Sequence, residues 1–210
     1  TAFVTMTREK AHQSMEQYQR DMTNGLAHDM KSPLMIISGY AENLKENVHT
    51  EKREHYADAI LENVSYMNDI VADVMSLSKI EDGTYTLEKE ELELMDLLVA
   101  AKERYAMTIE EKKLEVSVSG TCKVNGDRRL LKRAVENLVN NAVKYTPEEG
   151  KIAITADEAG ISLTNDSQEK QKNGMGLSLV ESICKLHGFV LTAKGDADTF
   201  TARIAVEKKK

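Results

Sequence analysis

A histidine next to an aspartate, His28 and Asp29, is the first pair of residues in this chain that could do chemistry. A neutral imidazole in contact with water is a nucleophile, and the Asp29 carboxylate could hold one ring N–H and raise the basicity of the other nitrogen. Ser32 lies one helical turn further along the same face. Pro33 crowds the carbonyl group of Asp29, so we expect the helix to bend there. The pattern predicts that His28 is a solvent-facing nucleophile.

Four polar residues with helical spacing form a second candidate site: Asn137, Asn141, Lys144 and Tyr145. Their spacing places them on one face of a helix. Two carboxamides, an ammonium group and a phenol on one face suit an anionic ligand that carries a ring. The sequence therefore predicts a binding site for such a ligand on this helix.

A glycine pair, Gly174 and Gly176, precedes Leu177 at the start of a further predicted helix. Glycines at a helix start let backbone N–H groups approach a phosphate, and the helix dipole favours the anion. Gly-x-Gly occurs by chance in many sequences, so alone it is a weak signal.

The histidine lies in a region with two heptad-spaced apolar seams, which predict two helices joined by a turn near residues 47–51. Thr50 is the expected N-cap of the second helix. With Met30 and Leu34 at the d and a positions, His28 falls at b, on the solvent side. The seams comprise Met30, Leu34, Ile37, Ala41, Leu44 and Val48, and then Tyr56, Ile60, Asn63, Met67, Ile70, Val74 and Leu77.

A hairpin of two helices cannot bury two long seams well by itself. Pairing two copies would give a four-helix bundle, so we expect a homodimer. A plain structural coiled-coil dimer is the alternative that the heptads alone leave open.

The chain after Gly83 has a different pattern, with short alternating segments that predict strands. Helices are expected at residues 94–111, from Asp127 as N-cap to about Tyr145, and at 176–187, closed by Gly188. The whole chain is therefore of the α+β class, a helical hairpin followed by a two-layer α/β sandwich. The predicted strands are residues 85–87, 114–118, 151–156, 161–164, 189–193 and 199–206.

Composition excludes several classes of protein. The 210 residues carry a formal net charge of -7, which argues against a nucleic-acid surface. No apolar run is long enough to span a membrane. The two cysteines, Cys122 and Cys184, lack metal-type spacing and indicate reduced thiols in a cytosolic compartment.

The segment His-Asp-x-x-Ser-Pro-Leu on the first helix of a hairpin resembles the H-box of bacterial sensor histidine kinases, the sensors of two-component systems. The resemblance implies that His28 accepts a phosphoryl group and that Asp29 is the general base that assists its attack. It also implies that Ser32 positions water for dephosphorylating the partner protein.

Residues 137–147 resemble the N-box of the same family, within the Bergerat (GHKL) group of ATPases. The resemblance implies an ATP site in which Asn137 holds Mg²⁺ and Asn141 contacts phosphate or ribose. It further implies that Lys144 reaches the phosphates and that Tyr145 packs near the adenine. The segment with Gly174, Gly176 and Leu177 resembles the G2-box, which contacts phosphate, although Lys172 stands where the family has an earlier glycine.

Two departures from the family pattern affect the nucleotide site. Asn165 takes the place of the aspartate that reads the adenine amine; its carbonyl could still accept from that amine, but its own NH2 needs a separate partner. The family also places a long flexible lid where only about six residues separate Ser167 from Gly174. Either the lid is short in this chain or lid residues are missing from the sequence, and the second is the alternative we favour.

The resemblance implies a cytoplasmic part of a membrane-anchored sensor, divided into a signal-transmitting helix (1–20), a dimerisation and phosphotransfer domain (21–82) and an ATP-binding domain (83–210). It would transfer the γ-phosphoryl group of Mg-ATP to His28 and then to an aspartate of a response regulator. Two alternatives stay open: a catalytically inactive dimeric scaffold, and a related ATPase or serine kinase of the same nucleotide-binding group.

Overall fold

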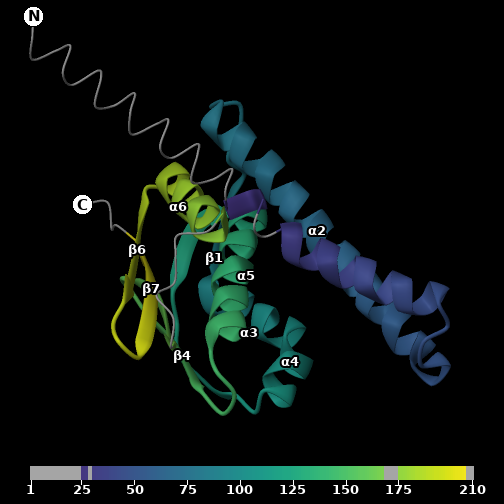
Figure 1. The fold of residues 1–210 in the computed structure, drawn as a ribbon. Coiled ribbons are helices and arrows are strands. Elements are labelled where there is room, and N and C mark those ends of the chain that lie inside the picture. The colour runs from purple at the N-terminus through teal and green to yellow at the C-terminus, as the bar shows by residue number, and fades with distance from the viewer. Residues whose placement is uncertain (1–24, 28–29, 168–174, 207–210) are drawn as a thin grey trace, which may run out of the picture. The chain divides into compact units, whose positions relative to one another are not determined.

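The structure is a computed structural model in which residues 25–27, 30–167 and 175–206 are described (Figure 1). His28, Asp29 and Gly174, together with the segment expected to form the lid, lie outside these residues. The chain divides into two compact units, Thr1–Ser76 and Leu77–Lys210, and we describe each by itself.

The first unit contains the predicted helical hairpin. Its first helix is described over residues 30–45, and the second is α2 (Arg53–Glu81), of which residues 53–76 belong to this unit. The two helices lie side by side near their connection, where the ring of Tyr40 stacks on that of Tyr56 with 5.2 Å between centroids. The edge of Tyr40 also meets His55, at 5.8 Å. This aromatic cluster fixes how the two helices meet at the turn.

The turn between the helices differs from our prediction at Thr50. Thr50 is not an N-cap; it is the first residue of a 3-10 helix, η1 (Thr50–Lys52), that runs directly into α2. Asn47 and His49 adopt left-handed backbone conformations, with φ of 53° and 47°. The Lys52 N–H donates to the His49 carbonyl at 2.8 Å. The backbone therefore makes this turn, without a side-chain cap.

Burial along the hairpin follows the second predicted seam and only part of the first. All members of the second seam are buried or half-buried, with Tyr56, Ile70 and Leu77 the most buried. In the first seam Leu34 is 47% exposed, and Ala41 and Val48 are exposed too. A further apolar row on α2 is exposed in the single chain: Leu61, Val64, Val71 and Met75.

Helix α2 ends where the sequence predicts. Gly83 has a φ of +65°, and the Thr84 N–H donates back to the Lys79 carbonyl at 3.2 Å. A glycine in the left-handed region just after the last turn is a common way to close a helix.

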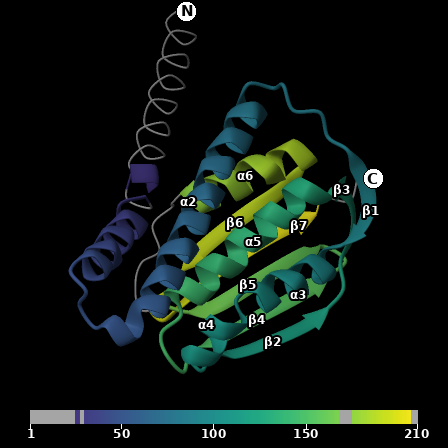
Figure 2. The same ribbon diagram turned by 90° about the vertical axis from the view of Figure 1, so that its right-hand side faces the viewer.

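The second unit is the predicted two-layer α/β sandwich. Its described part has a five-stranded sheet in the order β2-β4-β5-β7-β6. Strands β2 and β4 are parallel, and the other neighbours are antiparallel. Helices α3, α5 and α6 lie over one face of the sheet (Figure 2). The strands are β2 (Glu115–Gly120), β4 (Lys151–Asp157), β5 (Gly160–Asp166), β6 (Phe189–Gly195) and β7 (Thr199–Val206).

The helices of this unit are α3 (Leu94–Arg104), α4 (Ala106–Glu111), α5 (Arg128–Tyr145) and α6 (Met175–His187). The single helix expected at 94–111 is thus wrong: it breaks at Tyr105, whose backbone (φ −102°, ψ 15°) leaves the helical region.

The strand expected at 85–87 is also wrong, because residues 84–88 have no regular structure. The chain instead forms β1 (Lys89–Glu93), which pairs antiparallel with β3 (Lys123–Asp127) in a two-stranded ribbon. The sequence of β1 has one apolar residue, Leu92, which is also its one buried residue, so there was no apolar alternation to detect.

The core of the second unit lies between helix and sheet. One face of α5 is fully buried at spacings of three and four residues, as its pattern requires. Both cysteines are free and buried. Among the described helices, none has the length and apolar character needed to cross a membrane. The buried α5 residues are Leu130, Leu131, Ala134, Val135, Leu138, Val139, Ala142 and Val143.

Candidate nucleotide-binding site

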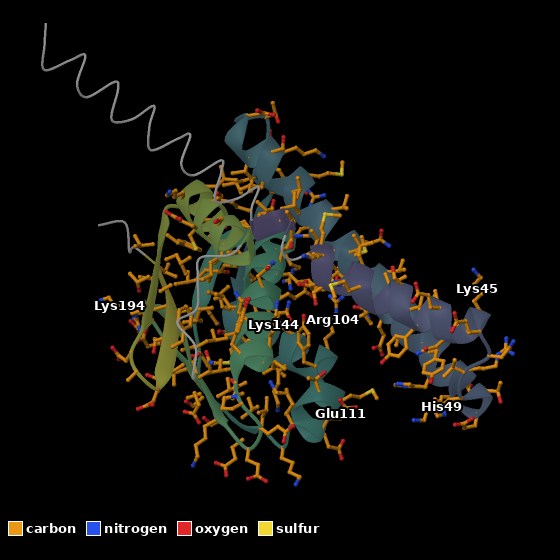
Figure 3. All side chains as sticks on the ribbon, viewed as in Figure 1. Lys45, His49, Arg104, Glu111, Lys144 and Lys194 are labelled. Carbon is orange, nitrogen blue, oxygen red and sulfur yellow. The ribbon has the colours of Figure 1, made fainter. Side chains whose placement is uncertain are left out.

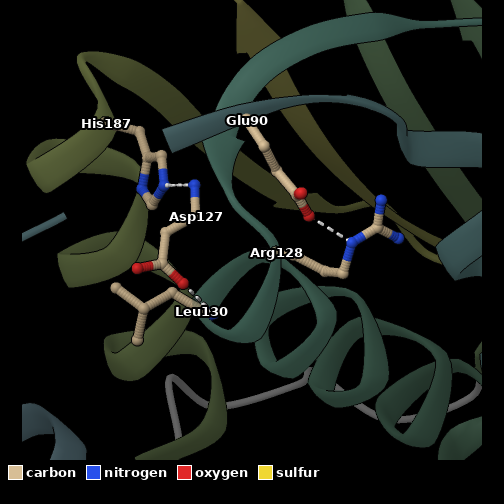
Figure 4. Close-up of polar contacts among 5 residues, drawn as sticks. All are labelled: Glu90, Asp127, Arg128, Leu130 and His187. Carbon is tan, nitrogen blue, oxygen red and sulfur yellow. Dashed lines mark hydrogen bonds and ion pairs between the residues drawn. The ribbon is translucent and has the colours of Figure 1, made fainter. Parts of the chain in front are cut away.

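The start of α5 is fixed by Asp127, the predicted N-cap. Its Oδ1 accepts from the Leu130 N–H at 3.1 Å, and its own N–H donates to Nε2 of His187 at 3.0 Å (Figure 4). Nδ1 of His187 lies 2.8 Å from the Ile183 carbonyl, so the neutral ring carries its proton on Nδ1. These contacts join the N-cap of α5 to the end of α6.

The charges of this junction follow from its burial. Burial lowers the pKa of His187, which keeps the ring in the neutral form that the two contacts need. Burial would raise the pKa of Asp127, but hydrogen bonds from the Leu130 and Glu88 N–H groups and the Tyr85 hydroxyl outweigh it, and the pKa is lowered. A charged carboxylate at the start of α5 also suits the helix dipole.

The predicted polar face of α5 is present, and it borders the buried face of the helix. Asn137, Asn141 and Tyr145 are half-buried and Lys144 is exposed. Nζ of Lys144, which Figure 3 labels, lies 5.2 Å from the centroid of the Tyr145 ring. The ammonium and the phenol are thus neighbours at the carboxyl end of the helix.

The start of α6 meets this face at Asn137. The Asn137 Nδ2 donates to the Arg133 carbonyl at 3.1 Å, which leaves its Oδ1 facing Gly176 of α6. A Cβ added at Gly176 would lie 2.6 Å from that Oδ1 and 3.7 Å from Nδ2 of Asn141. With the Asn137 amide in this position, only glycine fits at this point of α6. Asn141 and Gly176 are 35 positions apart in the sequence, yet α5 and α6 bring their residues together in one site.

Asn165 lies on β5, which packs against α5, and its side chain is buried. Its Nδ2 donates to the Asp166 carbonyl at 2.8 Å, which supplies the separate partner that the sequence required. The nitrogen is engaged there, so Oδ1 is the atom of this amide suited to accept a hydrogen bond from a ligand amine.

Comparison with known proteins identifies what this arrangement belongs to. The His Kinase A (phospho-acceptor) domain matches residues 18–83. The "Histidine kinase-, DNA gyrase B-, and HSP90-like ATPase" domain matches residues 126–208. The chain belongs to the sensor histidine kinases.

The relatives of this chain are distant in sequence. It is 26% identical over 216 residues to the histidine protein kinase DivJ of Caulobacter vibrioides, covering 86% of the chain and 36% of DivJ. It is 25% identical over 226 residues to the heme sensor protein HssS of Staphylococcus haemolyticus, covering 93% of the chain and 50% of HssS. The chain thus spans half or less of the length of these two curated relatives.

The histidine kinase AdeS of Acinetobacter baumannii has the same fold, with a TM-score of 0.63 at 20% identity. That likeness covers 86% of this chain and 98% of the AdeS chain. It confirms the fold expected from the sequence, a helical hairpin followed by an ATPase-type α/β sandwich.

The structure brings together some of the predicted site residues of this chain and not others. Ser32 is exposed on the first helix, in the other unit. Leu177 is buried, so its side chain belongs to the core and only its backbone is available for a ligand. One residue of the site's surroundings, Lys112, was missed, because its contacts are more than 30 residues away and no local pattern marks them.

Proposed function

We propose that this chain is the catalytic part of a sensor histidine kinase, which binds Mg-ATP between α5, α6 and β5 and phosphorylates His28. The observation that carries the proposal is the close approach of Gly176, at the start of α6, to the side-chain amides of Asn137 and Asn141 on α5. Helix α6 would present its first backbone N–H groups to the phosphates beside these amides. The ammonium of Lys144 would add a positive charge at the same face.

The residues fit a magnesium ion and an adenine ring. Asn137 offers an oxygen, the ligand type that Mg²⁺ prefers, and its amide is already oriented by the bond to Arg133. Bound magnesium would neutralise phosphate charge. Asn165 offers Oδ1 to the adenine amine from a buried position, and Tyr145 offers a ring face.

The reaction we propose is an in-line displacement. A ring nitrogen of His28 forms a bond to the γ-phosphorus while the bond from that phosphorus to the bridging oxygen of ADP breaks, and ADP leaves. Asp29 holds the proton on the other ring nitrogen and stabilises the positive charge that the ring develops. A carboxylate of a response regulator then takes the phosphoryl group and restores the free histidine. Ser32, which is exposed, would orient water for dephosphorylation of that partner protein.

The exposed apolar residues of the hairpin support a homodimer. Leu61, Val64, Val71 and Met75 on α2 are between 42% and 67% exposed in the single chain. They recur at intervals of three, seven and four residues, which is heptad spacing. A second copy of the hairpin would cover this row in a four-helix bundle. We therefore propose that residues 21–82 form the dimerisation and phosphotransfer domain and residues 83–210 the ATP-binding domain.

A catalytically inactive scaffold is the second candidate, and Asn165 favours it. A carboxylate would accept two hydrogen bonds at the adenine position, whereas the Asn165 amide offers one oxygen. Titration with Mg-ATP by calorimetry separates the two candidates. A kinase binds nucleotide, Asn137→Ala weakens that binding at least tenfold, and His28→Ala leaves it unchanged. A chain that takes up no nucleotide, or an Asn137→Ala variant with unchanged affinity in magnesium buffer, would contradict the proposed site.

A further inference from the structure

Lys112 is a half-buried lysine at the end of α4 whose side chain reaches the far end of α5. Its Nζ donates to the carbonyl oxygens of Val143 at 2.8 Å, Lys144 at 3.3 Å and Thr146. A lysine whose three N–H bonds all have backbone acceptors is held in place, unlike a lysine that extends into solvent.

The end of α5 needs such a donor. Thr146 leaves the helix with ψ of 129°, because Pro147 follows it and disfavours the helical backbone. The Thr146 N–H makes the last helical bond, to the Ala142 carbonyl at 3.1 Å. The next carbonyl, that of Val143, would pair with the N–H of residue 147, but proline has none. The Lys112 ammonium supplies the missing donor and places a positive charge at the negative end of the helix dipole.

The backbone of Lys112 is held by hydrogen bonds, as its ammonium group is. Its N–H donates to the Thr108 carbonyl at 3.0 Å, and its own carbonyl accepts from the Glu149 N–H at 2.8 Å. At the start of β2, the Glu115 N–H donates to the Gly150 carbonyl at 2.9 Å. The α4–β2 turn and the segment after α5 are therefore joined by backbone bonds close to the ammonium.

We propose that Lys112 is a positioning residue of the nucleotide site: by binding the carbonyls of Val143 and Lys144, it fixes the last turn of α5 so that the Lys144 side chain is held toward the phosphates. Lys112 itself stays on the carbonyl side of the turn and touches no nucleotide. The proposal rests on the proposed function, since it assumes that Lys144 contacts ATP. The affinity for ATP would then depend on a residue outside the N-box, Lys112.

The test is a set of calorimetric titrations of the full chain with Mg-ATP. Lys112→Met keeps the length of the side chain and removes the charge and the donors. The matched control is Lys113→Met, because the neighbouring Lys113 side chain is 75% exposed and pairs only loosely with Glu149 at 3.7 Å. We expect Lys112→Met to weaken Mg-ATP binding about tenfold, the equivalent of one lost charged hydrogen bond. Lys113→Met should stay within about twofold of the wild type, and Lys112→Arg should recover part of the loss.

A double-mutant cycle distinguishes positioning from general stabilisation. In a Lys144→Ala background, Lys112→Met should weaken binding less than about twofold, because the contact that Lys112 positions is already gone. An equal loss in both backgrounds, or no loss in the wild-type background, overturns the proposal. Circular dichroism checks that each variant is folded, and Lys112→Gln, which is uncharged but keeps two of the N–H donors, replaces Lys112→Met if the latter unfolds. If the wild type binds ATP while Lys112→Met changes nothing, only this proposal fails; if the wild type binds no ATP, the proposed function fails with it.

Discussion

Replacing Gly176 by alanine should separate ATP binding from folding. The new Cβ would lie 2.6 Å from Oδ1 of Asn137, well inside the ~3.5 Å separation of atoms in contact. The obstacle is the end of a side chain, so the Asn137 carboxamide can move away by about 1 Å. That movement breaks its bond to the Arg133 carbonyl, at a cost of about 1 kcal/mol. Alanine in a helix regains up to about 1 kcal/mol over glycine.

The free energy of unfolding of Gly176→Ala should therefore stay within about 1 kcal/mol of the wild type. The affinity for Mg-ATP should fall at least tenfold, because a metal ligand displaced by about 1 Å is beyond the few tenths of an ångström that coordination tolerates. Urea unfolding measures the first quantity and calorimetry the second. Gly39→Ala is the matched control, since a Cβ there meets nothing within 4 Å.

A combined variant tests the stated cause. In Asn137→Ala the obstacle is gone, so adding Gly176→Ala should cost little further affinity. Unchanged ATP affinity in Gly176→Ala, or losses that simply add in the double variant, would refute the reasoning that α6 and Asn137 form one site.

Three further predictions concern the core, the junction and the dimer. Leu138→Ala, on the buried face of α5, should lower the free energy of unfolding by about 2–5 kcal/mol in urea titrations, whereas Lys132→Ala on the exposed face should change it little. The pKa of His187 is lowered in the folded chain, so its contribution to stability is complete above its ordinary value of 6.5 and is lost as the pH falls through the lowered value. Unfolding free energies at about pH 7.5 and pH 5.5 should thus differ more in the wild type than in His187→Gln, and equal differences would contradict this account. The pair Leu61→Glu and Val71→Glu should convert a dimer into a monomer in sedimentation experiments, because two carboxylates would replace exposed members of the α2 row; a variant that still sediments as a dimer would show that this row is not the interface.

The helices of the site were predictable from the sequence because their signals are local. Asp127 at the start of α5, Pro147 just after its end and Gly188 after α6 each act within a few residues of the helix that they limit. The polar face of α5 followed from spacing alone. The need for a separate partner of the Asn165 amide followed from its donor count, and the Asp166 carbonyl meets it.

The features that sequence reasoning missed depend on distant parts of the chain. Strand β1 exists because β3, over 30 residues later, pairs with it, and its own residues are mostly charged. The break at Tyr105 interrupts a segment whose composition suits one continuous helix. The contact of Lys112 with α5 and the approach of Gly176 to Asn137 are likewise tertiary, so neither spacing nor propensity could reveal them.

The most direct measurement of the central claim is the chemical position of a phosphoryl group delivered from ATP. The full chain is incubated with Mg-ATP that carries a labelled γ-phosphate, digested at alkaline pH and mapped by mass spectrometry. The account predicts one labelled site, a phosphohistidine at His28 that is lost in acid and stable in base, and no label in His28→Ala. An acid-stable phosphate on another residue, or labelling of His28→Ala at the wild-type rate, would contradict it.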